Sequence, residues 1–128
     1  MLLHSLYFSD VPGKGRGMFS SEDIAKGEIL EVSPVIVLSL DDRVLLDQTL
    51  MHDYIFEWGN TGGKCCVALG YISIYNHSPI SNCEYIMDYE NHTITIHSVR
   101  YVKAGDELTI NYNGDWNNPK PVWFDLHD

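Results

Sequence analysis

Hydrophobic and polar residues alternate along several short stretches of this chain, and a period of two is typical of β-strands that are buried on one face. The clearest stretch covers residues 93–99, where Ile94 and Ile96 fall on one face and two threonines on the other. Together with residues 83–88 it predicts a β-hairpin whose turn lies at residues 90–92. Ile94 and Ile96 are therefore expected to share one face of the second strand.

Three other short segments predict strands. Residues 32–40 are apolar and β-branched, and Pro34 near their beginning indicates that the early part is an edge or a bend. Residues 54–58 read as a short aromatic strand that ends in a glycine-rich loop at 59–63. Residues 65–69 complete the set, so the chain is rich in strands and turns.

One segment, residues 41–51, is the best candidate for a helix. Asp41 or Asp42 can cap its amino end. The rest of the chain reads as strands and turns. Three side chains give the predicted helix a rough apolar face: Val44, Leu45 and Leu50.

A short similarity recurs between residues 24–30 and residues 102–108. Both segments read as a turn that closes on a glycine, Gly27 or Gly105, before a new strand. We interpret it as one turn used twice and not as a repeated domain. The length of 128 residues suits one domain with one core, and no linker or low-complexity segment divides it.

The charge is strongly acidic, with 18 acidic against 8 basic residues and a formal net charge of -10. Such a surface repels the phosphates of nucleic acids and attracts basic partners, although it also serves solubility alone. No apolar run approaches the roughly 20 residues of a membrane span, and the amino end lacks the features of a signal peptide. The three cysteines fit neither a disulfide framework nor a zinc site, so an intracellular compartment, cytoplasm or nucleus, is expected.

A glycine-rich segment at residues 13–19 is the first candidate for chemistry. Its three glycines alternate with Lys14 and Arg16. Glycines at this spacing let a backbone approach a ligand closely and leave its N–H and C=O groups able to bind it. The pattern matches neither a phosphate loop nor a dinucleotide fingerprint. Taken alone, it also suits a flexible surface turn.

Two further segments are notable because of their composition and order. Residues 75–78 read Tyr-Asn-His-Ser, and residues 107–112 read Glu-Leu-Thr-Ile-Asn-Tyr. Alone, Asn76 and His77 suit a turn whose histidine is satisfied by its neighbours. Tyr112 alone suits a half-buried packing residue at the end of a strand. No carboxylate or serine lies at a spacing that suggests a catalytic triad.

Taken together and in this order, the three segments resemble the motifs of the SET-domain protein lysine methyltransferases. The resemblance runs from about residue 13 to about residue 116. It implies a mainly β SET fold, with small curled antiparallel sheets and little helix. In that fold, the carboxy-terminal segment is threaded under a preceding loop. Such a pseudoknot is a rare exception to the rule that connections are not threaded. The resemblance also implies that residues 1–128 are a single SET domain, with an aromatic tail at 117–128 in place of a cysteine-rich zinc segment.

In that family, the glycine-rich loop and the asparagine–histidine pair hold S-adenosylmethionine. The resemblance implies that the Asn76 amide binds the amino-acid end of the cofactor and that backbone groups at His77 bind the adenine. Trp123 lies where carboxy-terminal aromatic residues of relatives cover the adenine, although a tail docked on the core is the plainer reading. Besides Trp123, seven positions are implied to bind the cofactor: Lys14, Gly15, Arg16, Gly17, Asn76, His77 and Tyr112.

The resemblance also implies the chemistry. Tyr112 matches the family's catalytic tyrosine, whose hydroxyl lies where cofactor and lysine meet. Tyr54 and Trp116 match positions that line the substrate channel. The family places phenylalanine or tyrosine where Trp116 stands, so its bulk implies a tight channel and leaves open how many methyl groups are added.

Two more departures from the family lie in the loop after His77. Pro79 stands where relatives often carry cysteine, and Ser81 stands where they carry proline. Since proline fixes φ, we expect a changed path of this loop and not a lost site.

The implied function is transfer of a methyl group from S-adenosylmethionine to a lysine side chain in a protein. A basic protein or peptide, such as a histone tail, suits the acidic surface, whereas no metal, nucleic acid or membrane is expected as a ligand. The sequence leaves open whether the chain forms a homodimer to complete its substrate groove. The alternative, from a different class, is a SET-like module that binds protein without turnover.

Overall fold

Two β-sheets form the framework of the computed structural model, which describes residues 1–59 and 62–113. Every neighbouring pair in the larger sheet is antiparallel. Its five strands stand in the order β4 (Ile55–Glu57), β5 (Cys65–Ala68), β3 (Ile29–Leu38), β8 (Thr93–Ser98) and β7 (Cys83–Asp88).

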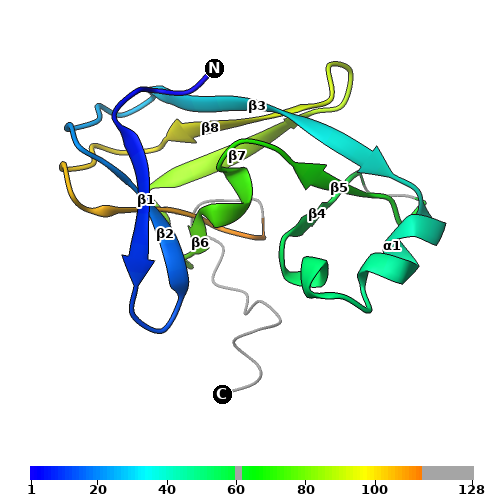
Figure 1. Ribbon diagram of the computed structural model, residues 1–128. Coiled ribbons are helices and arrows are strands. Elements are labelled where there is room, and N and C mark those ends of the chain that lie inside the picture. Colours follow the sequence, from blue (N-terminus) through cyan, green and yellow to red (C-terminus); the bar gives the residue numbers. More distant parts are fainter. Residues whose placement is uncertain (60–61, 114–128) are drawn as a thin grey trace.

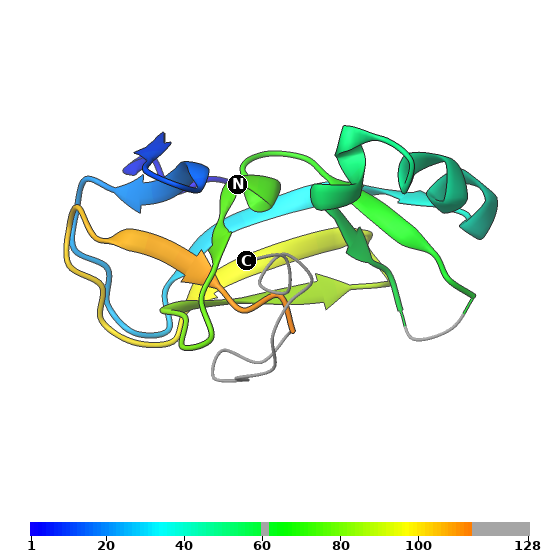
Figure 2. The same cartoon turned by 90° about the horizontal axis from the view of Figure 1, so that it is seen from below.

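The smaller sheet brings together segments from both halves of the chain. Its four strands stand in the order β1 (Leu6–Val11), β2 (Gly15–Ser20), β9 (Glu107–Ile110) and β6 (Asn76–His77). β1, β2 and β9 pair in antiparallel fashion, as predicted, and the two-residue strand β6 joins β9 in parallel. Figures 1 and 2 show β1 and β2 at one end of the molecule and the helix at the other.

The β7–β8 hairpin confirms the prediction made from the period of two. The two strands pair from Cys83↔Ser98 to Asp88↔Thr93. Ile94 and Ile96 are fully buried, whereas Thr93 and Thr95 on the other face are partly exposed. One face of β8 therefore belongs to the core that the two sheets enclose.

β3 is the central strand of the larger sheet, although its early part, predicted to be an edge or a bend, pairs within that sheet with β8 alone. It pairs with β8 up to Pro34 and with β5 from Val35 onward. Because proline has no N–H to donate, Pro34 suits the point at which the strand changes partner. Its carbonyl still accepts a hydrogen bond, from Leu69 N at 3.1 Å.

The helix is shorter than predicted: α1 spans Leu40–Leu46, and the hydroxyl of Ser39 caps it by accepting from Asp42 N at 3.2 Å. The predicted aspartate caps lie inside the first turn instead. A 3-10 turn, η1 (Leu50–Asp53), follows and is capped by Thr49. No residue of α1 is buried, so its apolar period has no core to pack on. No helix in the described part of the chain is long and apolar enough to cross a membrane.

The two similar turns meet in space. Ile24 and Val102 exchange two backbone hydrogen bonds, each 2.8 Å long. Gly27 and Gly105 both adopt a positive φ, 82° and 88°, which glycine alone adopts at no steric cost. The recurring sequence is thus one turn used twice, side by side, as interpreted.

The loop between β6 and β7 is tied to β9. Asn82 Nδ2 donates to Glu107 O at 2.9 Å, and Asn82 Oδ1 accepts from Thr109 N at 2.8 Å. Ser78 N donates to Ile110 O at 3.0 Å. β9 therefore runs between β2 on one side and β6 with this loop on the other. Most of the carboxy-terminal segment predicted to be threaded lies outside the described residues.

Replacing Ile96 by alanine should lower the free energy of unfolding by about 2–5 kcal/mol, because it leaves a cavity in the core. Thr95→Ala, on the opposite face of the same strand, should change it by about 1 kcal/mol or less. Urea unfolding followed by tryptophan fluorescence measures both values. Equal losses would contradict the assignment of the two faces of β8.

Candidate functional site

Two cavities meet at a pair of tyrosines. The first, of about 660 Å³, is named here the glycine-loop cavity, and the second, of about 640 Å³, the helix-side cavity. Four residues line both cavities: Asp53, Tyr54, Ser73 and Tyr112. The glycine-loop cavity is lined in addition by Asp10, Gly13, Lys14, Gly15, Arg16, Ile74, Asn76 and His77.

The turn between β1 and β2 forms one wall of the glycine-loop cavity. It is closed by the backbone hydrogen bond from Lys14 N to Val11 O at 3.0 Å. Gly13 and Gly15 adopt positive φ values of 80° and 82°, which a side chain would make costly. The turn thus presents backbone without side chains to the cavity at Gly13 and Gly15. Lys14 lies between these two glycines, and Arg16 follows them.

Asn76, at the start of β6, joins this wall to β9. Its Nδ2 donates to Arg16 O at 2.9 Å and to Glu107 Oε2 at 2.7 Å. The other Glu107 oxygen forms an ion pair with Lys14 at 3.7 Å. Because both hydrogens of the Asn76 amide are donated within the protein, its Oδ1 is the amide atom that can accept a hydrogen bond from a ligand.

Gly17 allows this arrangement because it has no side chain. A Cβ at this position would stand 2.6 Å from Glu107 Oε2, 2.8 Å from Val11 Cγ2 and 3.0 Å from Asn76 Nδ2. Gly17 does not line the cavity. It lies behind the Asn76–Glu107 hydrogen bond and leaves room for it.

Tyr112 follows β9 and is held at three atoms. Its hydroxyl donates to Tyr75 O at 2.8 Å, and its backbone N–H donates to His77 Nδ1 at 3.1 Å. Its carbonyl accepts from the Tyr85 hydroxyl at 3.3 Å. The His77 ring lies 5.2 Å from the Tyr112 ring, and its accepting Nδ1 places the ring hydrogen of the neutral form on Nε2.

Burial raises the pKa of Tyr112 to about 12, and the nearby Glu107 and Tyr54 contribute to this shift. A low dielectric disfavours the charged phenolate, and a neighbouring negative charge does the same. Tyr112 therefore keeps its proton at neutral pH, with the hydrogen directed at Tyr75 O.

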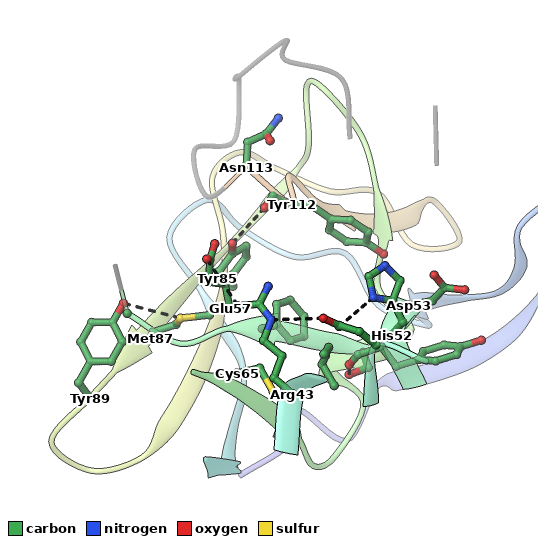
Figure 3. Close-up of a pocket in the computed structure, with 16 residues that line it drawn as sticks. Arg43, His52, Asp53, Glu57, Cys65, Tyr85, Met87, Tyr89, Tyr112 and Asn113 are labelled. Carbon is green, nitrogen blue, oxygen red and sulfur yellow. Dashed lines mark hydrogen bonds and ion pairs between the residues drawn. The ribbon is translucent and has the colours of Figure 1, made fainter. Parts of the chain in front are cut away.

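The helix-side cavity has a charged rim (Figure 3). Arg43 Nη1 lies 3.7 Å from Glu57 Oε1, and its Nε lies 3.9 Å from Asp47 Oδ2. The second oxygen of Asp47 lies 3.0 Å from His52 Nδ1. Four aromatic side chains also line this cavity: Tyr54, Phe56, Tyr85 and Tyr89.

Apart from Gly17, the described residues of the predicted site all line these cavities. Lys14, Gly15, Arg16, Asn76, His77 and Tyr112 surround one cavity, and Tyr54 lies where it joins the second. Trp116 and Trp123 lie outside the described residues.

Sequence reasoning did not single out Glu107 and Glu31. Glu107 lies inside a recognised motif, but nothing local shows that its carboxylate binds Asn76. Glu31 is fully buried in β3, and a carboxylate within an apolar run was the available signal. Asp53 and Ser73, which line both cavities, follow from no local pattern.

The glycine-loop cavity has the groups to hold a small zwitterionic molecule. Bare backbone, the Lys14 ammonium and acceptor oxygens on Asp10 and Asn76 all line it. Among the described residues, no group of three His, Cys, Asp or Glu side chains is suited to hold a metal ion.

Comparison with known proteins gives one consistent result. The family model of the SET domain matches residues 15–113. The chain is 33% identical, over 121 residues, to the histone-lysine N-methyltransferase, H3 lysine-37 specific, of Schizosaccharomyces pombe, and the match covers 94% of this chain and 77% of that protein.

Two solved structures share the fold. A candidate histone methyltransferase of Plasmodium falciparum has a TM-score of 0.62 and 25% identity, over 88% of this chain and 96% of that chain. An S-adenosylmethionine-bound Polycomb Repressive Complex 2 of Chaetomium thermophilum has a TM-score of 0.71 and 22% identity. That match covers 91% of this chain and 16% of the other, so it indicates a common fold alone.

Raising the pH should destabilise the protein partly through Tyr112. The pKa of its phenol is about 12 when folded against a usual value of 10.0, so its contribution to stability is full below about pH 10 and is lost towards pH 12. Tyr112→Phe has no proton to lose, and its free energy of unfolding should fall less steeply over this range. Urea unfolding at about pH 9, 10 and 11 tests this, and identical slopes for the two proteins would refute it.

Proposed function

Because this chain belongs to the SET-domain family and has its fold, we propose that it is a protein-lysine methyltransferase that uses S-adenosylmethionine. One observation carries the proposal. The Tyr112 hydroxyl, bound to Tyr75 O at 2.8 Å, belongs to a residue that lines both cavities. A methyl donor in the glycine-loop cavity and a lysine entering from the helix-side cavity would meet beside this residue.

The glycine-loop cavity suits S-adenosylmethionine in size and in chemistry. Its volume of about 660 Å³ falls within the range of small-molecule sites, roughly 300–1,000 Å³. The Lys14 ammonium complements a carboxylate, and Asn76 Oδ1 and the Asp10 carboxylate complement an ammonium group. The amino-acid end of the cofactor carries both of these groups, so it would lie between the glycine-rich turn and β6.

Tyr112 acts by position and not by taking a proton. S-adenosylmethionine supplies a methyl group that is already activated by a positive sulfur. Since the Tyr112 hydrogen is directed at Tyr75 O, the lone pairs of the phenol oxygen would be left to accept weak C–H contacts from that methyl group. With the pKa of its phenol raised to about 12, Tyr112 stays neutral at physiological pH and aligns the reacting atoms.

The helix-side cavity would prepare the lysine. An ammonium has no lone pair, so the lysine must lose a proton before it attacks. Burial against Tyr54, Phe56 and Tyr85 disfavours the charged form, and a positive charge in the adjoining cavity repels it. Both effects lower the pKa of the lysine, and the proton leaves through water.

We further propose that the substrate is a basic protein, with a histone tail as the leading candidate. The formal charge of -10 favours association with basic chains. The Schizosaccharomyces pombe relative is named as a histone methyltransferase, which supports the class of substrate.

Incubation with methyl-labelled S-adenosylmethionine and a panel of histones and other basic proteins tests the proposal. Mass spectrometry of the products would identify the modified lysine and the number of methyl groups. Labelled lysine is the expected result. Binding of S-adenosylmethionine without transfer to any protein would favour a non-catalytic SET-like interaction module instead.

Tyr112→Phe should lower kcat by about a hundredfold or more, because the aligning hydroxyl is lost. The dissociation constant of S-adenosylmethionine should stay within about fivefold, since the other cofactor contacts remain. Single-turnover kinetics and calorimetry measure the two effects. Unchanged turnover would remove Tyr112 from its proposed role.

Gly17→Ala should weaken binding of S-adenosylmethionine by about tenfold or more. The new methyl group would displace the Asn76 amide and the Glu107 carboxylate, which it approaches within 3.0 Å. Ser9→Ala is the matched control, because Ser9 pairs with Gly17 across the hairpin and its side chain is exposed. Calorimetry compares the two variants, and equal affinities would show that Asn76 and Glu107 do not shape the cofactor site.

A further inference from the structure

Glu31 is a fully buried carboxylate in the middle of β3. Three neutral groups donate hydrogen bonds to it: the Tyr75 hydroxyl at 3.0 Å, Tyr71 N at 2.8 Å and the Ser33 hydroxyl at 2.7 Å. Among the described residues, no lysine, arginine or histidine forms an ion pair with it. Since an ionised carboxylate is costly to bury without a cation, its presence calls for a physical reason.

The carboxylate of Glu31 accepts hydrogen bonds from both ends of one short turn. The 3-10 turn η2 spans Ile72–Ile74, with Tyr71 just before it and Tyr75 just after it. Glu31 Oε2 accepts from the backbone N–H of Tyr71, and Oε1 accepts from the side chain of Tyr75. One side chain on the central strand of the larger sheet thus fixes where this turn begins and where it ends.

Tyr75 passes this constraint on to Tyr112. The Tyr75 side chain is fully buried and bonded to Glu31, and its carbonyl accepts the Tyr112 hydroxyl at 2.8 Å. A shift of the Tyr75 side chain would move the carbonyl of the same residue. The direction of the Tyr112 O–H bond therefore depends on a contact that lies on the far side of Tyr75.

Gly70 provides the space that the carboxylate needs. Its φ is 66°, and a Cβ there would overlap Glu31 Oε2 and Ser33 Oγ. The chain enters the turn so close to Glu31 that only glycine fits. The contact between carboxylate and turn is therefore built into the backbone as well as into the side chains.

From this chain of contacts, and resting on the proposed methyltransferase function, we propose that Glu31 is a positioning residue for the Tyr112 hydroxyl, acting through Tyr75. It touches neither cavity and holds no substrate. It fixes the carbonyl to which the Tyr112 hydroxyl donates, and so it fixes which way the lone pairs of that oxygen point. A displacement of the order of 1 Å at a reacting centre lowers rates by about a hundredfold.

Two substitutions change the side-chain contact between Glu31 and Tyr75 and leave the backbone groups in place. Glu31→Gln keeps the shape of the side chain but replaces one accepting oxygen with an NH2 group. Tyr75→Phe removes only the hydroxyl that binds Glu31. Ser20→Ala is the matched control, because it removes a buried hydrogen bond of 3.0 Å between Ser20 and Ser5, which line neither cavity.

Each variant is prepared alone and together with Tyr112→Phe. We expect Glu31→Gln and Tyr75→Phe each to lower kcat by about tenfold or more, with the dissociation constant of S-adenosylmethionine changed by less than about threefold. In the Tyr112→Phe background neither should lower kcat further, because the hydroxyl they position is gone. Ser20→Ala should leave kcat unchanged in both backgrounds.

Tyrosine-labelled NMR gives a readout that does not depend on turnover. The Tyr112 ring signal, identified by its loss in Tyr112→Phe, should shift in Glu31→Gln and Tyr75→Phe and stay in place in Ser20→Ala. An unshifted signal, or losses of kcat that multiply with that of Tyr112→Phe, would overturn the proposal. If Glu31→Gln does not fold, Tyr75→Phe decides by itself. A wild-type protein without methyl transfer would reject the proposed function, while the NMR shifts would still test the Glu31 contact.

Discussion

The parallel pairing of β6 with β9 is the constraint on which the site depends. It sets Asn76 opposite Thr109 and His77 opposite Ile110, so the residues that follow β9 must pass beside His77. Parallel strands need a long connection, and the entropic cost of closing such a connection rises only slowly with its length. Asn82, through its bonds to the β9 backbone, holds the connecting loop on the same strand. The tyrosine and the asparagine–histidine pair meet because of this pairing, and no local interaction would replace it.

Sequence patterns predicted the β-structure well where burial follows the pattern. Ile94 and Ile96 are apolar at a period of two, and the face they define is the face that the core covers. The helix shows the opposite case. Val44 and Leu45 are 51% and 65% exposed, so the apolar period of this helix is not matched by burial among the residues that the structure describes. Periodicity reports which residues share a face of an element. It does not report what lies opposite that face.

The candidate site divides in the same way. Asn76, His77 and Tyr112 belong to recognisable motifs, and their predicted meeting is what the structure shows. The carboxylates that support them were not predicted. In the sequence, Glu107 and Glu31 look like ordinary strand residues. Their roles become visible only in the fold, which places Asn76 and Lys14 beside Glu107 and the backbone N–H of Tyr71 beside Glu31. A motif identifies residues that recur together, whereas the partners that orient them depend on long-range contacts.

The contacts around Tyr112 favour a rigid and neutral hydroxyl over a reactive one. Burial and the adjacent Glu107 raise the pKa of its phenol, which would hinder a general base near pH 7. The same surroundings suit a group that must keep its hydrogen directed at Tyr75 O. The buried Glu31 fits this logic, because an apolar cluster of similar volume often packs as stably as a buried charge or better. A carboxylate at that position accepts hydrogen bonds from fixed directions, which apolar packing cannot do, and the aligning role proposed for the Tyr112 hydroxyl requires a fixed direction.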